Sequence, residues 1–414
     1  YCFLLYGTAA GTVFHKVFFS QTGNGTTALI LSYMSFAIGY IAGPFGAIFF
    51  GHIGDRKGRK VTMYASLLMM GISTSIIGIL PPAASAGVGV VIVLQLMRLA
   101  QCFGRGGTWG GGILMAYENV PENKRSFYAA IPQIGLPIGF GLSSILIAVP
   151  TLLLPEDIFF TWGWRIPFLA AIILTLIVIR QKGEMMETED YKKAQAKLEA
   201  EEAEGKKHKV GFIPMVKGYW KTLLLGCGTR WVDGTFYNIF IVWILSYCIN
   251  WLGMPLIQTY IITIIACIFK IPFTLFGGWC AQKLGNTRTF VIGALASAVL
   301  SIPTLKVIEL SKGNLAITII GIVLGWSIAY NLIWAVISSL WSSYFETEVR
   351  YSGISFVYHV PSFLVAGMVP TICTLLINYG KGDTIYVGIY STVVALISAA
   401  CALALKARHD RGEK

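Results

Sequence analysis

Long apolar runs separated by short polar loops dominate the chain, and six of them lie on each side of its longest polar stretch. Most are long enough for a helix to cross a bilayer, which takes about 20 apolar residues. The first set is 1–14, 27–53, 61–81, 88–117, 126–151 and 165–181; the second is 216–250, 256–280, 289–308, 315–343, 351–378 and 385–406. This pattern predicts an all-α membrane protein with twelve transmembrane helices in two six-helix bundles.

The same pattern predicts how the chain is divided. We expect one bundle over 1–181, a linker over 182–215, a second bundle over 216–406 and a tail over 407–414. The first run is short and no charged segment precedes it, so we expect a truncated first helix rather than a signal peptide. The linker is densely charged, which is typical of a solvated tether.

Basic residues predict the orientation of the helices, because Lys and Arg concentrate in cytoplasmic loops. On one predicted side lie 23 of them, including those of the linker, whereas the other side holds only Lys16, Lys306, Lys312 and Lys381. We therefore expect a multi-pass protein of the plasma (inner) membrane with both termini and the linker in the cytoplasm.

Composition excludes several classes of protein. Of the 414 residues 55% are hydrophobic and 13% are charged, against about 25% charged in soluble domains. The net charge of +12 lies mostly in short loops, whereas a nucleic-acid binder would gather it on a soluble face. The eight cysteines are scattered through apolar runs, so we expect neither a disulfide framework nor a metal site. Motifs of intramembrane enzymes are absent from the sequence, and we predict no enzyme and no cofactor.

A motif follows the second apolar run, in the pattern G-x-x-x-D-R-x-G-R-K. It resembles the signature loop of the major facilitator superfamily. A carboxylate here can accept hydrogen bonds from a helix N-terminus and pair with an arginine. We therefore predict a latch that holds one face of the bundle shut. The predicted gating residues are Gly51, Asp55, Arg56, Gly58, Arg59, Lys60 and Glu118.

The second half repeats this motif in eroded form, with Gln282 in place of the aspartate and Asn286 in place of an arginine. Further motifs lie in order along nearly the whole chain and together resemble the metabolite:H⁺ symporter family. They cover 1–7, 98–111, 127–137, 160–168 and 349–353. The resemblance implies the major facilitator fold and transport of a small metabolite such as citrate, α-ketoglutarate, shikimate, proline or betaine.

Departures from the family pattern affect proton coupling. The family usually has an aspartate at the position of Cys2 and a glutamate at that of Thr108. An ordinary thiol has a pKa of about 8.5, and a threonine does not titrate in the working range. Asp233 should stay ionised beside Arg230. His359 could change charge near neutral pH, although a lone histidine on a helix is more often structural. We predict weak or absent proton coupling by side chains.

Charged residues inside the apolar runs are the candidate binding residues, because each costs at least ~2.5 kcal/mol at the bilayer centre. Arg98, Gln101, Arg105 and Thr108 form one helical stripe, and Arg230, Asp233 and Tyr237 form another. Asp233 can neutralise Arg230 at i+3, which leaves Arg98, Arg105 and Lys270 as cations. The alternative to a binding role is structural: each arginine reaches toward the membrane surface or pairs with carbonyl groups at a helix end. Tyr6 and Gln133 complete the predicted cavity lining.

These residues favour an organic anion as substrate, because guanidinium groups match carboxylates. We expect Arg98 and Arg230 to clamp it, and two rocking halves to carry it across the bilayer by alternating access. Coupled symport, uniport and exchange stay open. The alternatives are a zwitterion or osmolyte:H⁺ symporter, and a transporter-like sensor that moves no solute.

Overall fold

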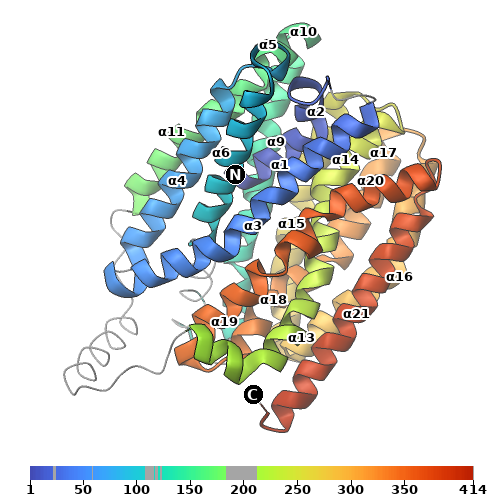
Figure 1. The fold of residues 1–414 in the computed structure, drawn as a ribbon. Coiled ribbons are helices and arrows are strands. Elements are labelled where there is room, and N and C mark those ends of the chain that lie inside the picture. Colours follow the sequence, from blue (N-terminus) through green and yellow to red (C-terminus); the bar gives the residue numbers. More distant parts are fainter. Residues whose placement is uncertain are drawn as a thin grey trace.

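The computed structural model describes residues 1–21, 25–57, 59–107, 116, 120–121, 124–182 and 212–413, and every regular element in these ranges is helical. The helices form two groups that lie side by side, the first drawn blue to green and the second yellow-green to red (Figure 1). The predicted all-α architecture is confirmed.

The first group begins with six helices that end at Gly106. They are α1 (Cys2–Thr12), α2 (Phe14–Val17), α3 (Gly25–Lys57), α4 (Arg59–Ile79), α5 (Ala83–Ala86) and α6 (Val88–Gly106). The remaining elements of this group are α8 (Arg125–Ala130), η2 (Pro132–Ile134), α9 (Gly135–Leu153), α10 (Glu156–Ile158), η3 (Phe159–Gly163) and α11 (Arg165–Lys182). Within this group α6 contacts both α3 and α4, and α4 also contacts α11.

The second group has longer helices interrupted by short π-helical segments. It opens with α13 (Phe212–Asn238), η4 (Ile239–Trp243), α14 (Ile244–Asn250), α15 (Leu256–Leu284) and α16 (Asn286–Leu310). It continues with α17 (Leu315–Ile322), η5 (Val323–Ala329), α18 (Asn331–Tyr344), α19 (Thr347–His359), η6 (Phe363–Gly367), α20 (Val369–Tyr379) and α21 (Ile385–Asp410). Here α16 contacts α18 and α21, and α21 also contacts α13.

Ten helical stretches in the described residues are long and apolar enough to cross a membrane. They are Gly25–Phe50, Val61–Ile79, Val88–Gly106, Arg125–Leu153, Glu156–Arg180, Val216–Asn250, Leu256–Leu284, Asn286–Leu310, Leu315–Tyr344 and Ile385–Asp410. The two other predicted spans are present as shorter pieces. The first is the 11-residue α1, and the eleventh is divided among α19, η6 and α20.

π-helical turns interrupt three spans of the second half, at η4, η5 and η6, and η3 forms a fourth such segment in the first half. Such turns insert an extra residue into a helix and are frequent at functional sites. The segment η5 ends immediately before Tyr330 and Asn331, and η6 follows His359 by a few residues. The π-helical turns therefore lie next to polar residues of the second half.

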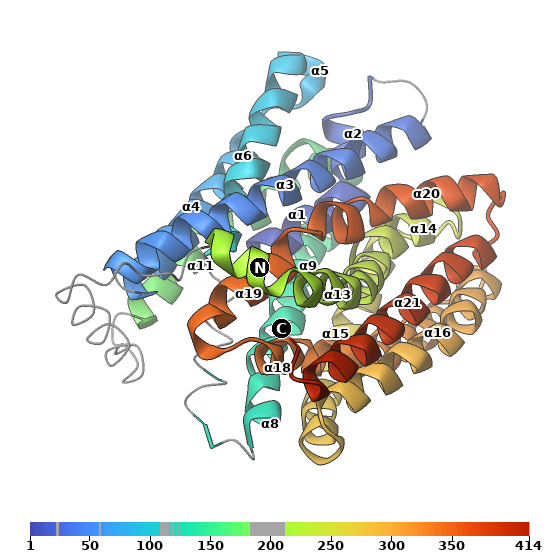
Figure 2. The ribbon, with the colours of Figure 1, turned by 60° about the horizontal axis from the view of Figure 1, so that its bottom comes forward.

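The two halves meet along two seams. In one, α3 packs against α19, η6 and α20, and in the other α15 packs against α8 and α9 (Figure 2). Small residues allow the close approach that helix packing in membranes requires. A Cβ on Gly367 would lie 3.1 Å from the Cα of Ala37, and one on Gly278 would lie 2.7 Å from the Cβ of Ala130. Beside the first seam, Arg105 of the first half reaches Tyr358 of the second half.

Candidate substrate-binding site

Arg98 lies on α6 with its side chain fully buried in the first half. It donates one hydrogen bond to the side-chain oxygen of Gln101. Its Nε and second Nη atoms lie 3.4 and 3.5 Å from the carbonyl oxygen of Phe36 on α3. The guanidinium therefore has neutral partners, all from the first half of the chain.

Gln101 holds three helices of the first half together. Its amide nitrogen donates to the carbonyl oxygen of Cys2 on α1 at 3.0 Å and to the hydroxyl of Thr74 on α4 at 2.8 Å. Its oxygen accepts from Arg98, so the orientation of the amide is fixed from both ends. The predicted stripe of Arg98 and Gln101 on one helix face is thus a hydrogen-bonded unit. Arg98 contacts α3, and Gln101 contacts α1 and α4.

Arg105, two turns further along α6, reaches the other half. It donates a hydrogen bond to the hydroxyl of Tyr358 on α19. Its guanidinium carbon also lies 3.8 Å from the ring centroid of Phe3 and 5.7 Å from that of Tyr40. Of the arginines predicted on α6, Arg105 is the one that touches the second half.

Arg230 and Asp233 on α13 form the buried ion pair that their i, i+3 spacing predicts. The other carboxylate oxygen of Asp233 accepts a hydrogen bond from the hydroxyl of Tyr330. The guanidinium carbon of Arg230 lies 4.4 Å from the ring centroid of Tyr358, and that of Arg105 lies 5.2 Å from the same centroid. The structure therefore brings Arg105 and Arg230 to one tyrosine ring, whereas Arg98 stays within the first half.

Lys270 on α15 is fully buried in the second half. Its ammonium donates to the side-chain oxygen of Asn331 at 2.9 Å and lies 3.4 Å from the carbonyl oxygen of Trp326. The amide nitrogen of Asn331 returns a hydrogen bond to the carbonyl of Lys270 at 2.8 Å. The rings of Trp326 and Tyr330 lie 4.7 and 4.4 Å from the ammonium. Like Arg98, this cation has neutral partners.

The remaining predicted residues lie around these charges. Tyr6 is fully buried, and its hydroxyl lies 2.5 Å from that of Ser35. Tyr237 is buried on α13. His359 packs beside α3, where a Cβ on Gly43 would lie 2.9 Å from its Nδ1. Gln133 is buried in η2; its carbonyl oxygen accepts from Trp334 at 3.0 Å, and its amide nitrogen has no partner among the described residues.

Of the predicted gating residues, Gly58 and Glu118 lie outside the described residues, as does Thr108 of the predicted coupling positions. For Gly51, Asp55, Arg56, Arg59 and Lys60 the description covers the helical backbone of α3 and α4 alone. The latch stays a prediction. The eroded copy is described, and there Asn286 accepts a hydrogen bond from Ser339 at 3.0 Å.

Several residues of the site were not among the candidates predicted from the sequence. Asn331 carried a usable signal, because an amide inside a long apolar run is costly to bury without partners. Tyr358 and Tyr330 carried none, because aromatic residues in membrane helices are more often packing or interface residues. Their roles depend on contacts across the fold that spacing along one helix does not reveal.

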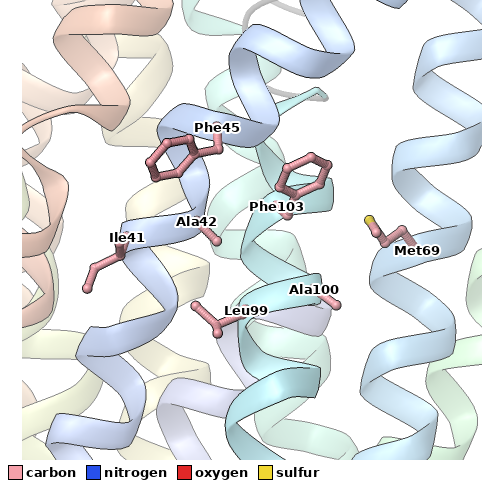
Figure 3. A pocket seen from close by; sticks show the side chains of 7 residues that line it. All are labelled: Ile41, Ala42, Phe45, Met69, Leu99, Ala100 and Phe103. Carbon is pink, nitrogen blue, oxygen red and sulfur yellow. The ribbon is translucent and has the colours of Figure 1, made fainter.

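Metal-ligating side chains and an apolar groove are the other features that bear on binding. Among the described residues, no group of three His, Cys, Asp or Glu side chains is placed to hold a metal ion, and all eight cysteines are free. An apolar groove of about 460 Å³ lies on the outside of the first half between α3, α4 and α6 (Figure 3). Its lining is Ile41, Ala42, Phe45, Met69, Leu99, Ala100 and Phe103. Such a lining suits hydrocarbon rather than a polar solute.

Comparisons with known proteins identify the class. The profile of the Major Facilitator Superfamily matches residues 3–366. The solved structure of a D-xylose-proton symporter has the same fold, with a TM-score of 0.70 at 16% identity over 98% of this chain and 94% of that one. The inward-open conformation of the xylose transporter XylE from E. coli superposes with a TM-score of 0.64, also at 16% identity, over 98% and 93% of the two chains.

This chain belongs to the major facilitator superfamily and is a multi-pass membrane protein. The inner membrane metabolite transport protein YhjE of Escherichia coli (strain K12) is 34% identical over 99% of this chain and 91% of that protein. The shikimate transporter of the same strain is 31% identical over 98% and 91%. The proline/betaine transporter of Salmonella typhimurium is 27% identical over 96% and 78%. The predicted family resemblance is confirmed.

Proposed function

We propose that this protein carries a small organic anion across the membrane by alternating access. The moving parts are the two halves, 1–181 and 216–406, joined by the linker 182–215. In the superfamily such halves rock about a site near the bilayer midplane. The names of the similar transporters support a small metabolite as solute. The 23 basic residues on one predicted side support an inner-membrane protein with both termini in the cytoplasm.

The buried cations are the reason for proposing an anion as the substrate. Asp233 neutralises Arg230, whereas Arg98 and Lys270 contact no carboxylate among the described residues. A buried charge without an opposite charge is costly, so a bound anion would lower the free energy of the site. The positive field of these groups would also draw anions toward the seam.

The anion itself is proposed to bind beside Tyr358, where Arg105 approaches from the first half and Arg230 from the second. This assignment differs from the expected pair of Arg98 and Arg230, because Arg98 hydrogen-bonds to Gln101 and Phe36 within the first half. Two guanidinium groups from different halves would let the substrate stabilise one arrangement of the halves. Its release would then favour another, which is the requirement for coupling binding to movement.

Proton coupling through side chains is proposed to be weak. The family position of an aspartate is occupied by Cys2, a buried thiol whose backbone carbonyl accepts from Gln101. Asp233 is engaged by Arg230 and Tyr330. His359 is the remaining candidate, and it packs against α3 at Gly43. Any dependence of transport on pH would then come largely from ionisation of the substrate.

A zwitterion or osmolyte:H⁺ symporter is the second candidate, and its support is the 27% identity to a proline/betaine transporter. A sensor that binds solute without moving it is the third. Counterflow in proteoliposomes separates all three when carboxylates and zwitterions are compared with and without a pH gradient. We expect counterflow of a carboxylate in the wild type and its loss in Arg105→Ala.

Arg165→Ala is the matched control for this experiment. Arg165 lies on α11, away from the seam, and donates to the carbonyl oxygens of Gly78 and Leu80 at 2.9 and 2.5 Å. It should leave carboxylate counterflow intact. Uptake of zwitterions alone would support the symporter, and binding without flux would support the sensor.

A further inference from the structure

Three aromatic rings surround the guanidinium group of Arg98. The centroids of Phe3, Tyr6 and Phe36 lie 4.5, 4.3 and 4.7 Å from its Cζ atom. Phe3 and Tyr6 come from α1 and Phe36 comes from α3, whereas Arg98 enters from α6. The rings also pack on one another, with 5.9 Å between the centroids of Phe3 and Phe36. We call these three rings the aromatic cage.

Rings arranged in this way attract cations through their quadrupoles, and they are the usual means of recognising quaternary ammonium groups. In this protein the cation is a side chain of the same chain. It is fully buried, and its N–H groups are directed at Gln101 and at the carbonyl of Phe36. The cage and its acceptors therefore already hold a ligand.

The backbone nearby also accommodates the guanidinium. A Cβ on Gly39 would lie 2.6 Å from the Nε of Arg98 and 2.9 Å from the Sγ of Cys102. A larger residue at this position of α3 would need the space that the arginine fills. The fit is thus shared by three helices, α1, α3 and α6, rather than being a chance contact of one side chain.

We propose that the aromatic cage is a cation-binding site filled by Arg98, and that Arg98 thereby excludes quaternary ammonium and other cationic head groups from the first half. The proposal rests on the proposed anion transport and deepens it by naming a class of substrate that the site rejects. The main cause of exclusion is that Arg98 fills the volume. The guanidinium of Arg105, 3.8 Å from the ring of Phe3, adds a weaker repulsion, which Arg98→Ala leaves in place.

The test is to remove the internal cation and supply an external one. Purified wild type and Arg98→Ala in detergent are titrated with methylguanidinium chloride and tetramethylammonium chloride, with binding measured by calorimetry and Tm by thermal unfolding. We expect no response from the wild type. Arg98→Ala should bind both cations and gain Tm, and methylguanidinium should bind more tightly because Gln101 and the Phe36 carbonyl can accept its N–H groups.

Two variants serve as matched controls. Arg165→Ala also removes a guanidinium, but one beside which the described residues place a single ring, that of Trp164, at 4.8 Å; it should bind neither cation. Adding Phe36→Leu to Arg98→Ala removes one wall of the cage and should weaken binding about tenfold. Equal binding by the single and double variants would overturn the proposal.

Arg98→Ala could fail to fold without a cation in the cage, and methylguanidinium tests this as well. If Arg98→Ala is recovered folded only when methylguanidinium is present during extraction, the proposal is supported. Arg98→Ser is the second variant, because it also removes the charge and empties the cage. A folded Arg98→Ala or Arg98→Ser that binds neither cation overturns the proposal. Binding is measured without transport, so the cage can be confirmed even if the wild type moves no anion.

Discussion

Arg105 of α6 donates a hydrogen bond to the hydroxyl of Tyr358 on α19, and this bond joins the first half of the chain to the second. Arg230 of the second half lies over the same tyrosine ring. A single aromatic side chain thus contacts one guanidinium from each half. Any movement of the halves that opens this seam must change the surroundings of Tyr358.

Tyr358→Phe should weaken this connection while keeping the ring. A hydrogen bond to a charged group contributes about 1.5–3 kcal/mol, so we expect a lower Tm and weaker anion binding. Tyr379→Phe is the control, because Tyr379 is 76% exposed on α20. Identical Tm and substrate affinity in wild type and Tyr358→Phe would contradict the assignment of this tyrosine to the site.

The ion pair of Arg230 and Asp233 should be more sensitive to loss of one partner than to loss of both. Arg230→Leu or Asp233→Leu leaves one charged group buried without its partner, at a cost of about 3–5 kcal/mol. Replacing both by leucine removes the charge as well as the bond and should recover much of that loss. Thermal unfolding of the two single variants and the double variant gives the coupling energy, and strictly additive losses would contradict this prediction.

Lys270→Met should separate stability from binding. The ammonium is fully buried among neutral partners, so its removal should leave Tm unchanged or raise it. Anion binding should weaken by about tenfold or more, or ~1.4 kcal/mol. Lys283→Met on the same helix is the control, because Lys283 is exposed and lies over Trp279. A large fall in Tm for Lys270→Met would show that the lysine is structural.

Gly46→Ala tests the close packing of α3 on α6. The added Cβ would lie 2.0 Å from the carbonyl oxygen of Phe103, so the helices must separate, at a cost of about 1–3 kcal/mol. Gly89→Ala on α6 meets nothing within 4 Å and should gain up to about 1 kcal/mol from helix propensity. We expect opposite changes in Tm, and a neutral Gly46→Ala would contradict the packing described here.

Asp383, in the loop between α20 and α21, should make stability depend on acid pH. A hydrogen bond from Lys306 at 2.6 Å, aided by one from the backbone N–H of Ile385 at 2.7 Å, lowers the pKa of this carboxyl below its ordinary 3.8. A lowered pKa stabilises the fold fully above the ordinary value, and the effect is lost as pH falls through the folded-state pKa.

The measurement is Tm between about pH 3 and pH 7 for wild type and Asp383→Asn. The wild type should be the more stable at neutral pH, and the difference should shrink at the acid end. A difference in Tm that is constant over the whole range would contradict the role of this ionised carboxylate.

The membrane helices could be predicted because their signal is local. A run of apolar residues long enough to cross a bilayer has few other uses, and the ion pair of Arg230 and Asp233 follows from spacing on a single helix. The eleventh span was harder, because the predicted run 351–378 is divided among α19, η6 and α20. The sequence predicts the ends of a span more reliably than the α-helical or π-helical geometry of the turns within it.

Contacts between the halves could not be predicted in the same way. Arg105 and Tyr358 are 253 positions apart, and the choice of Arg98 as the partner of Arg230 assumed that both faced one cavity. The structure places three rings around Arg98. Tyr6 was among the residues predicted to line the cavity, whereas Phe3 and Phe36 were not. Whether a side chain lies inside one half or at the seam depends on how its helix is rotated about its axis. Hydropathy does not determine this rotation when apolar groups surround the helix on all sides.

The π-helical turns of the second half carry a consequence for insertions and deletions. Each α-helical residue advances the chain by about 100° around the axis, so deleting one residue from a regular span turns every later side chain away from its neighbours. A π-helical turn holds one residue more than the α-helical turn it replaces. Deleting one residue within Val323–Ala329 can therefore be absorbed by conversion to a regular helix, with Asn331 still directed at Lys270. In η4, η5 and η6 this half holds three places where its length can change by one residue without rotating the rest of the span.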